Sequence, residues 1–388
     1  GGGVGALTIT VGGALTDSGV NQAGLLTLNA AGQTVTLDAA NDFNSVMGTA
    51  GTLTVTDTDD LMLAGVNVGA GTGAMNLTVA GGLTDSAANY AGAVTLTAGN
   101  NVTLDNLNDF ISVAGTAVNM TLNDIDDLDL AGVNVGAGTL ALTAGSLTDS
   151  AANIAASLNL TVTGDVTLNN ANDFNTVIGT AANLTLTDVD DLALAGVNVG
   201  GGAGALTVTA GSLTDTAPNI AGALALTVAG NATLNDANDF DSVAGTAGNL
   251  TLNDVDDLDL AGVTSGAGAG NLTLTVAGAL TDSAPNQAGL ITINATGQAV
   301  TLDELNDFNS VVGTAASMTL TDVDDLNLAG VTVAGGSGPL TLTAGSLSDS
   351  AANFAGAVTL AVTGDAVLDA GNDFNSMAGT AANLTVND

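Results

Sequence analysis

The chain of 388 residues contains no lysine, arginine, histidine, cysteine or tryptophan. Without cationic side chains it cannot neutralise phosphates, and a formal net charge of −39 repels nucleic acids and anionic membrane surfaces. The missing types also exclude a Ser-His-Asp or Cys-His arrangement, a Schiff-base lysine, a disulfide framework and a zinc site with nitrogen or sulfur ligands. We therefore expect no nucleic-acid partner, and only carboxylates, hydroxyls and amides remain for chemistry.

Long hydrophobic runs and targeting features are missing as well. No apolar run approaches the roughly 18 residues of a membrane-spanning helix, so we expect no membrane insertion. The chain begins with Gly1, Gly2, Gly3 and Val4 and has no charged segment typical of a signal peptide. We interpret it as a mature product or a window cut from a longer chain or polymer.

What the sequence does contain is a tandem repeat of about 66 residues, present nearly six times. Copies four apart look most alike, which indicates duplication of a four-unit block in a longer parent chain. No linker or composition shift interrupts residues 1–388, so we expect one continuous repeat array. Three motifs mark the copies: Leu-Thr-Asp-Ser, with its Asp at 17, 85, 149, 215, 282 and 349; Asn-Asp-Phe, with its Phe at 43, 110, 174, 240, 308 and 374; and Asp-x-Asp-Asp-Leu, starting at 57, 124, 188, 254 and 322, with Asp388 at its first position.

The apolar pattern within one repeat predicts β-strands. Residues 205–209, 223–227 and 249–253 alternate apolar with small or polar residues, the period of a half-buried strand. Turns rich in Gly, Asn and Asp follow each strand, and helix-favouring residues are scarce. The strands return about every 22 residues, which predicts an all-β fold, a parallel β-solenoid with three coils per repeat. A string of β-sandwich domains is the alternative, but it needs about 100 residues per domain and large buried aromatics, and aromatics total 2%.

Stretches such as Leu142–Ser150 followed by Asp165–Phe174 resemble the repeats of filamentous-haemagglutinin-type bacterial surface proteins. The resemblance covers essentially the whole chain. It implies a right-handed β-helix, an extracellular or cell-surface location and a fibrous, often adhesive role. The absence of Lys and Arg departs from that family, and its export-recognition domain is not visible here.

The Asp-x-Asp-Asp motif is the sharpest polar feature. In the fourth copy Asp254, Asp256, Asp257 and Asp259 place four carboxylates within six residues, and carboxylate oxygens are the ligands that Ca²⁺ prefers. The other interpretation is that these Asp residues form turns and keep the surface hydrated. No cofactor is expected with certainty, and Ca²⁺ is the one candidate.

The other motifs favour structural roles. We expect the Phe of Asn-Asp-Phe to fill the interior beside an Asn and Asp corner, and the Asp of Leu-Thr-Asp-Ser to form a turn. Ten Asn-x-Thr sequons arise from strands that begin with Asn, and we interpret them as strand pattern rather than glycosylation sites. A carboxylate-based glycosidase would need one site in a groove, whereas every Asp cluster here recurs in each copy. We therefore expect no catalytic residues and no enzyme.

The sequence thus predicts a structural segment of an extracellular fibre, sheath or adhesin stalk. Expected partners are other copies, head to tail or side by side, together with divalent cations or surface glycans. The alternative is a binding surface, either a calcium-dependent adhesin or an ice-binding solenoid, because outward Thr residues at two-residue spacing would align between coils. Ala225 and Asn253 interrupt that array in the fourth copy.

Overall fold

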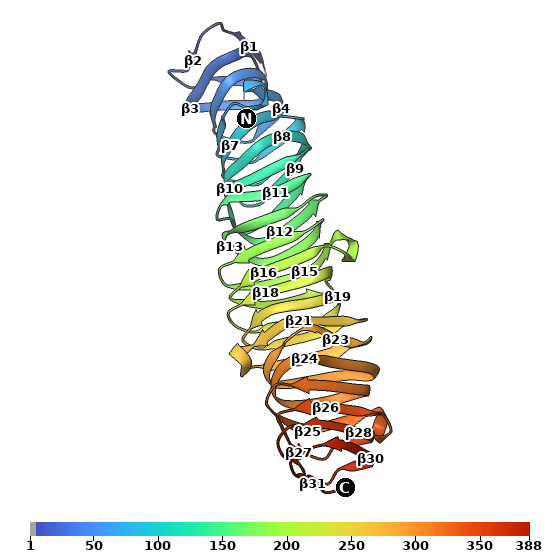
Figure 1. Cartoon of the computed structure of the whole chain (residues 1–388). Helices are drawn as coiled ribbons and strands as arrows, with labels where there is room; N and C mark the ends of the chain where they lie inside the picture. Colours follow the sequence, from blue (N-terminus) through green and yellow to red (C-terminus); the bar gives the residue numbers. More distant parts are fainter. Residues whose placement is uncertain (1–4) are drawn as a thin grey trace. The chain divides into compact units, whose positions relative to one another are not determined.

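The computed structural model describes residues 5–388 and divides the chain into two compact units, residues 1–189 and residues 190–388 (Figure 1). In the described residues, β-strands make up nearly all of the regular secondary structure, and they pair in parallel. No helix in the described part is long and apolar enough to cross a membrane. The parallel β-solenoid expected from the sequence is confirmed; the handedness of its coil stays a prediction.

Within residues 5–189 the first unit contains fourteen strands and one short 3-10 turn. They are β1 (Ala6–Thr10), β2 (Leu15–Thr16), β3 (Gln22–Asp57), β4 (Leu61–Val68), η1 (Gly69–Gly71), β5 (Met75–Val79), β6 (Leu83–Ala87), β7 (Tyr90–Ala98), β8 (Val102–Thr116), β9 (Met120–Asp124), β10 (Asp127–Ala144), β11 (Ser146–Ala151), β12 (Ile154–Val162), β13 (Val166–Ala181) and β14 (Leu184–Asp188).

The second unit contains seventeen strands and three 3-10 turns. They are β15 (Asp191–Val199), η2 (Gly200–Gly202), β16 (Ala205–Ala210), β17 (Ser212–Ala217), β18 (Ile220–Val228), β19 (Ala232–Ala247), β20 (Leu250–Asp254), β21 (Leu258–Ser265), η3 (Gly266–Gly268), β22 (Asn271–Val276), β23 (Leu280–Ala284), β24 (Gln287–Asp322), β25 (Asp325–Val333), η4 (Ala334–Gly336), β26 (Leu340–Ala344), β27 (Ser346–Ala351), β28 (Phe354–Val362), β29 (Ala366–Leu368), β30 (Asp373–Thr380) and β31 (Leu384–Val386).

The coil is shorter than the sequence pattern predicted. In the first unit six successive register steps lead from Leu61 to Val177, which is 116 residues (177 − 61) and about 19 residues per coil. The expectation of about 22 residues per coil and three coils per repeat is therefore corrected to about three and a half coils per repeat. The discrepancy arises because strands bend around corners without a Gly-rich turn: β24 alone runs for 36 residues.

A half-integral number of coils places equivalent residues of successive repeats on different faces. Core residues that pair in register from coil to coil form columns. Leu224 and Ile291 are equivalent, since they lie five residues after Asn219 and Asn286, but in the second unit they belong to different columns. The 3-10 turns η2, η3 and η4, which recur once per repeat, accordingly project from alternate sides of this unit in Figure 1. The first column is Leu192, Leu213, Ala232, Leu250, Leu272 and Ile291; the second is Leu206, Leu224, Val243 and Leu260.

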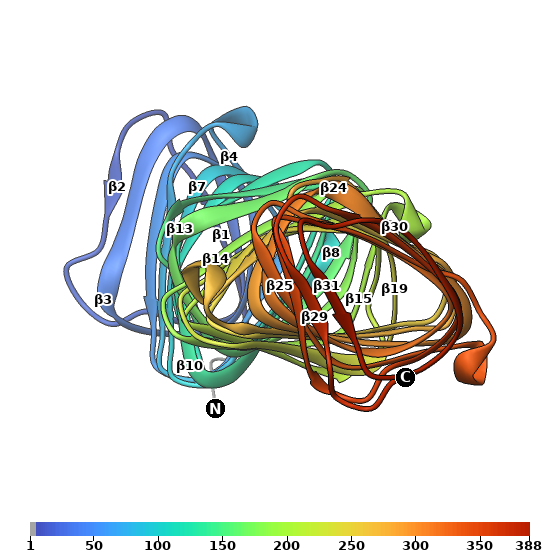
Figure 2. The same cartoon turned by 60° about the horizontal axis from the view of Figure 1, so that its bottom comes forward.

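The interior of the coils is a stack of Leu, Val, Ala and Phe side chains. Figure 2 shows obliquely the backbone loops that enclose it. The Phe of Asn-Asp-Phe is buried in each of the six copies, which confirms the predicted filling role. Burial of one such large apolar side chain stabilises a fold by about 1.5–3 kcal/mol. In the fourth copy the predicted strands appear as β16, β18 and β20, with Leu and Val inward and Thr outward.

Candidate functional site

A buried polar network recurs at one corner of each repeat, and it begins with the Asp of Leu-Thr-Asp-Ser. In the fourth copy Asp215 accepts hydrogen bonds from the backbone N–H groups of Asn235 (2.9 Å) and Asp236 (3.1 Å) in the next coil. It also accepts one from the Asn238 side chain, Nδ2 to Oδ2, at 2.8 Å. This Asp lies within strand β17 (Ser212–Ala217), so the turn expected from the sequence is not formed there; its side chain instead links two coils.

The Asn of Asn-Asp-Phe is the centre of this network. Asn238 is fully buried, and its Nδ2 donates to Asp215 and to the carbonyl oxygens of Leu234 and Asp236. Its Oδ1 accepts from both the backbone nitrogen (2.8 Å) and the side-chain nitrogen (3.1 Å) of Asn219, one coil earlier. Every polar atom of this side chain is therefore satisfied inside the solenoid, which is the condition for burying an amide at low cost.

The ladder continues through the second Asn. Asn219 is also fully buried, and its Oδ1 accepts from the backbone N–H of Val197, a further coil away, at 2.8 Å. The same Val-to-Asn-to-Asn-to-Asp chain recurs in other copies, for example with Val133, Asn153, Asn172 and Asp149 in the first unit. One buried ladder thus joins successive coils where a purely apolar corner would leave backbone N–H groups without acceptors.

The first Asp of Asp-x-Asp-Asp closes the network from the following coil. Asp254 is 1% exposed; its Oδ2 accepts the backbone N–H of Phe240 at 2.9 Å and its Oδ1 that of Asp256 at 3.1 Å. The backbone N–H of each Asn-Asp-Phe phenylalanine is held in the same way. Both carboxylate oxygens of this Asp therefore accept backbone hydrogen bonds. We call the first Asp of each Asp-x-Asp-Asp motif the clasp.

Burial shifts the protonation of these clasps. Desolvation raises the pKa of Asp124 and Asp254 to about 7 and that of Asp57 and Asp322 to about 6, although the backbone N–H donors act in the opposite direction. The neighbouring carboxylate two residues on adds a smaller repulsive contribution. No cationic side chain exists to offset these effects.

The geometry disperses the four carboxylates proposed as a calcium site. Asp254 turns inward, whereas Asp257 Oδ1 accepts the backbone N–H of Ala279 and Asp259 Oδ1 accepts the hydroxyl of Thr281 (3.2 Å), both in the next coil. Across residues 5–388, no group of three or more acidic side chains lies close enough to hold a metal ion. The turn interpretation therefore explains Asp254 better, and Ca²⁺ binding stays a prediction to be tested.

Two carboxylate oxygens remain buried without a hydrogen-bond partner in the described part of the chain, Asp42 Oδ1 and Asp59 Oδ1. They lie in adjacent coils, because the backbone N–H of Thr58 donates to the carbonyl of Asn41 at 2.9 Å. In the fourth copy the pKa of Asp239, equivalent to Asp42, is raised by burial and then by repulsion from Asp256. In the fourth copy the carboxylates of the equivalent pair, Asp239 and Asp256, therefore repel each other.

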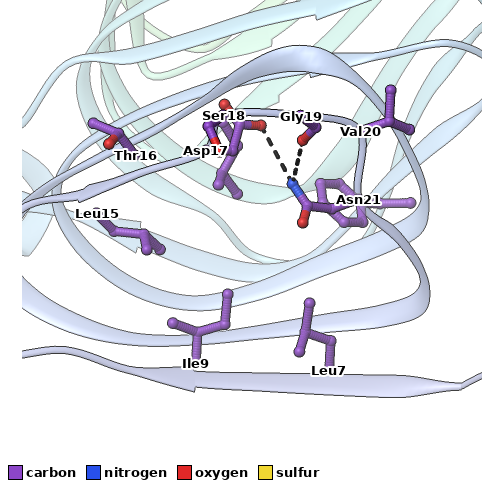
Figure 3. Close-up of a pocket in the computed structure, with 11 residues that line it drawn as sticks. Leu7, Ile9, Leu15, Thr16, Asp17, Ser18, Gly19, Val20 and Asn21 are labelled. Atoms are coloured by element: carbon purple, nitrogen blue, oxygen red, sulfur yellow. Dashed lines mark hydrogen bonds between the residues drawn. The ribbon is translucent and has the colours of Figure 1, made fainter.

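A hollow beside the first described coil belongs to the same network. Leu7, Ile9 and Leu15 line it on one side, and Asp17 and Asn21 on the other (Figure 3). Asn21 Nδ2 donates to the carbonyl of Gly19 at 3.0 Å and to Asp17 Oδ2 at 3.4 Å. One carboxylate, that of Asp17, lies in the lining beside the hydroxyls of Thr16 and Ser18, and it accepts hydrogen bonds from the side chains of Asn21 and Asn41.

Sequence reasoning missed the Asn ladder. The signal was present, because an Asn stands 19 or 20 residues before the Asn of each Asn-Asp-Phe motif. That spacing equals one coil of about 19 residues, so the two amides stack; the expected coil of 22 residues concealed the match. The first Asn is at 21, 89, 153, 219, 286 and 353, and the second at 41, 108, 172, 238, 306 and 372.

The fold and its recurring network define a tandem-repeat β-solenoid. Residues 2–50, 50–117, 115–181, 181–246, 247–315 and 315–381 each match the model of a family described as repeats of unknown function (DUF5649). These matches span nearly the whole chain, and the chain belongs to this family. No curated protein and no solved structure matches it.

Proposed function

We propose that the chain is a structural segment of an extracellular fibre, sheath or adhesin stalk. The observation that carries the proposal is the ladder of Asn and Asp side chains that ties each coil to the next in every repeat. A coil can separate from its neighbour only by breaking backbone pairing and this buried network together. Such a unit resists extension, which is the property a stalk requires.

The surface chemistry supports a location outside the cell. The chain offers no Lys or Arg, so proteases of trypsin-like specificity find no cleavage site. A net charge of −39 keeps the surface hydrated. As part of this proposal, the chain is similar to filamentous-haemagglutinin-type proteins and associates with further copies head to tail or side by side. We propose no catalytic role for it.

Electron microscopy of the native material tests this proposal. We expect unbranched filaments or a sheath labelled by an antibody against the chain, and labelling of unpermeabilised cells. Labelling confined to the cell interior, or discrete particles with no filament, would overturn it. Pulling single molecules by force spectroscopy supplies a mechanical readout: unfolding in repeat-sized steps at high force supports the stalk role, and extension without resistance contradicts it.

A further inference from the structure

One strip of outward side chains in the second unit is uncharged and regular. Five threonines pair in register in five successive coils, in strands β17, β19, β20, β22 and β24, and each is exposed or half-buried. We call this set the threonine face: Thr214, Thr233, Thr251, Thr273 and Thr292.

Asparagine and threonine side chains flank this column on both sides. Asn249 Nδ2 donates to Asn231 Oδ1 at 2.8 Å, and the backbone N–H of Asn271 donates to Asn249 Oδ1 at 2.8 Å, so one flank is a stack of amides. On the other flank Asn253, Thr275 and Asn294 pair in succession. None of these side chains carries a charge, in a chain with 39 acidic residues.

Simple copying of one motif does not explain the column. Because each repeat makes a half-integral number of coils, the five threonines come from five different positions within the repeat. Thr214 lies in Leu-Thr-Asp-Thr, Thr233 in Ala-Thr-Leu-Asn and Thr292 in Ile-Thr-Ile-Asn. Different sequence segments therefore each supply a threonine where the coils align.

The spacing of this array is set by the sheet. Threonines repeat at about 4.8 Å along the stack, and the flanking rank lies two residues away, roughly 6.7 Å along each strand. Each threonine offers one hydroxyl and one methyl group held by a rigid strand. A rigid periodic array gains most from a partner that is itself rigid, periodic and uncharged, because neither side loses conformational freedom on contact.

We infer that the threonine face binds the ordered water of an ice surface. Hydroxyl and amide groups supply hydrogen bonds to lattice water, and the methyl groups between them occupy positions that need no partner. A second copy of the chain fits this face less well, because side-by-side association of two chains of charge −39 requires cations between them, whereas contact with ice requires none. The inference does not depend on the proposed fibre role.

The experiment measures thermal hysteresis and inhibition of ice recrystallisation by the full 388-residue chain. A double variant, Thr251→Lys with Thr273→Lys, places two charged side chains in the middle of the face. A matched control, Leu305→Lys with Val323→Lys, makes the same charge change at a corner, where these side chains are 63% and 49% exposed. Circular dichroism melts establish that each variant is folded.

We expect the unmodified chain and the control to inhibit recrystallisation, and the threonine-face variant to require at least tenfold more protein. No activity in the unmodified chain, equal activity in all three, or equal loss in the control would overturn the inference. If the lysine variant does not fold, Thr251→Ser with Thr273→Ser decides, because it keeps the hydroxyls and removes the methyls. A several-fold loss of activity then supports the inference, and unchanged activity overturns it.

Discussion

Asn238 Nδ2 donates a hydrogen bond of 2.8 Å to Asp215 Oδ2, across 23 residues of sequence and one coil of the solenoid. Both side chains are buried, so neither can exchange this contact for water. Equivalent bonds join Asn108 to Asp85 and Asn172 to Asp149 in the first unit. The relationship couples two motifs that appear unrelated in the sequence and predicts where single substitutions do most damage.

Replacing Asn238 by Ala should destabilise the second unit by about 3 kcal/mol, because a buried N–H left without an acceptor costs roughly 1–3 kcal/mol and each further hydrogen bond lost costs about 0.5–1.5 kcal/mol. The backbone N–H of Asn219 loses its acceptor, whereas Asp215 Oδ2 and Asn219 Nδ2 each lose one hydrogen bond and keep another. The matched control is Asn235→Ala, since Asn235 is exposed and only its backbone enters the network. Thermal and urea melts measure the two stabilities. Equal melting of the two variants would contradict a stabilising role of the buried Asn238 amide.

Much of this architecture could be predicted from the sequence, but the number of residues per coil could not, and the features that depend on it were missed. Period-two strands and the repeated Phe were sufficient for a parallel solenoid with Phe inside. The coil length was not readable, because corners such as that between Asn41 and Ser45 lie within a continuous strand, β3, and carry no Gly or Pro. Once the length is about 19 residues, the spacing between Asn219 and Asn238 implies stacking.

Gly245 should tolerate no side chain. Its φ of 109° lies in the region that favours glycine, and an added Cβ would lie 2.0 Å from the carbonyl oxygen of Leu226 in the adjacent coil. We expect Gly245→Ala to lower the stability of the second unit by about 2–4 kcal/mol, from backbone strain and displacement of a core strand. Gly13→Ala is the control, because nothing lies within 4 Å of its added Cβ. A melt of Gly245→Ala that matches this control would show that the strand can shift freely.

Stability should rise on acidification from pH 8 to about pH 4. Burial raises the pKa of Asp254 and Asp124 to about 7 from an ordinary 3.8, so the folded chain binds protons more tightly than the unfolded chain. The stabilisation from protonating these groups is complete below about pH 4 and is lost as the pH rises towards 7. Above that pH these groups no longer change the stability. Melts across this range measure the slope.

Substitution isolates the clasp from the general charge. Asp254→Asn should reduce the pH slope, whereas Asp38→Asn, which removes one exposed carboxylate, should leave it nearly unchanged. The Asn side chain can still accept the Phe240 N–H but cannot accept both backbone donors, so a loss of about 1–2 kcal/mol at neutral pH is also expected. Identical slopes in the two variants would assign the pH dependence to the surface charge as a whole.

Cations should stabilise the chain by screening rather than by occupying a selective calcium site. The chain carries 39 carboxylates with no internal counter-charge, and two charges about 5 Å apart repel by roughly 1 kcal/mol even in water. Salt should therefore raise the melting temperature. Because no three acidic side chains converge among residues 5–388, Ca²⁺ and Mg²⁺ at equal concentration should raise it equally, and neither should raise it more than Na⁺ at matched ionic strength. Thermal melts in the three salts measure these shifts in melting temperature. A shift with Ca²⁺ well above that with Mg²⁺ would contradict the prediction. If Asp42→Asn or Asp59→Asn abolished it, the result would place a specific calcium site at the two unpartnered carboxylate oxygens.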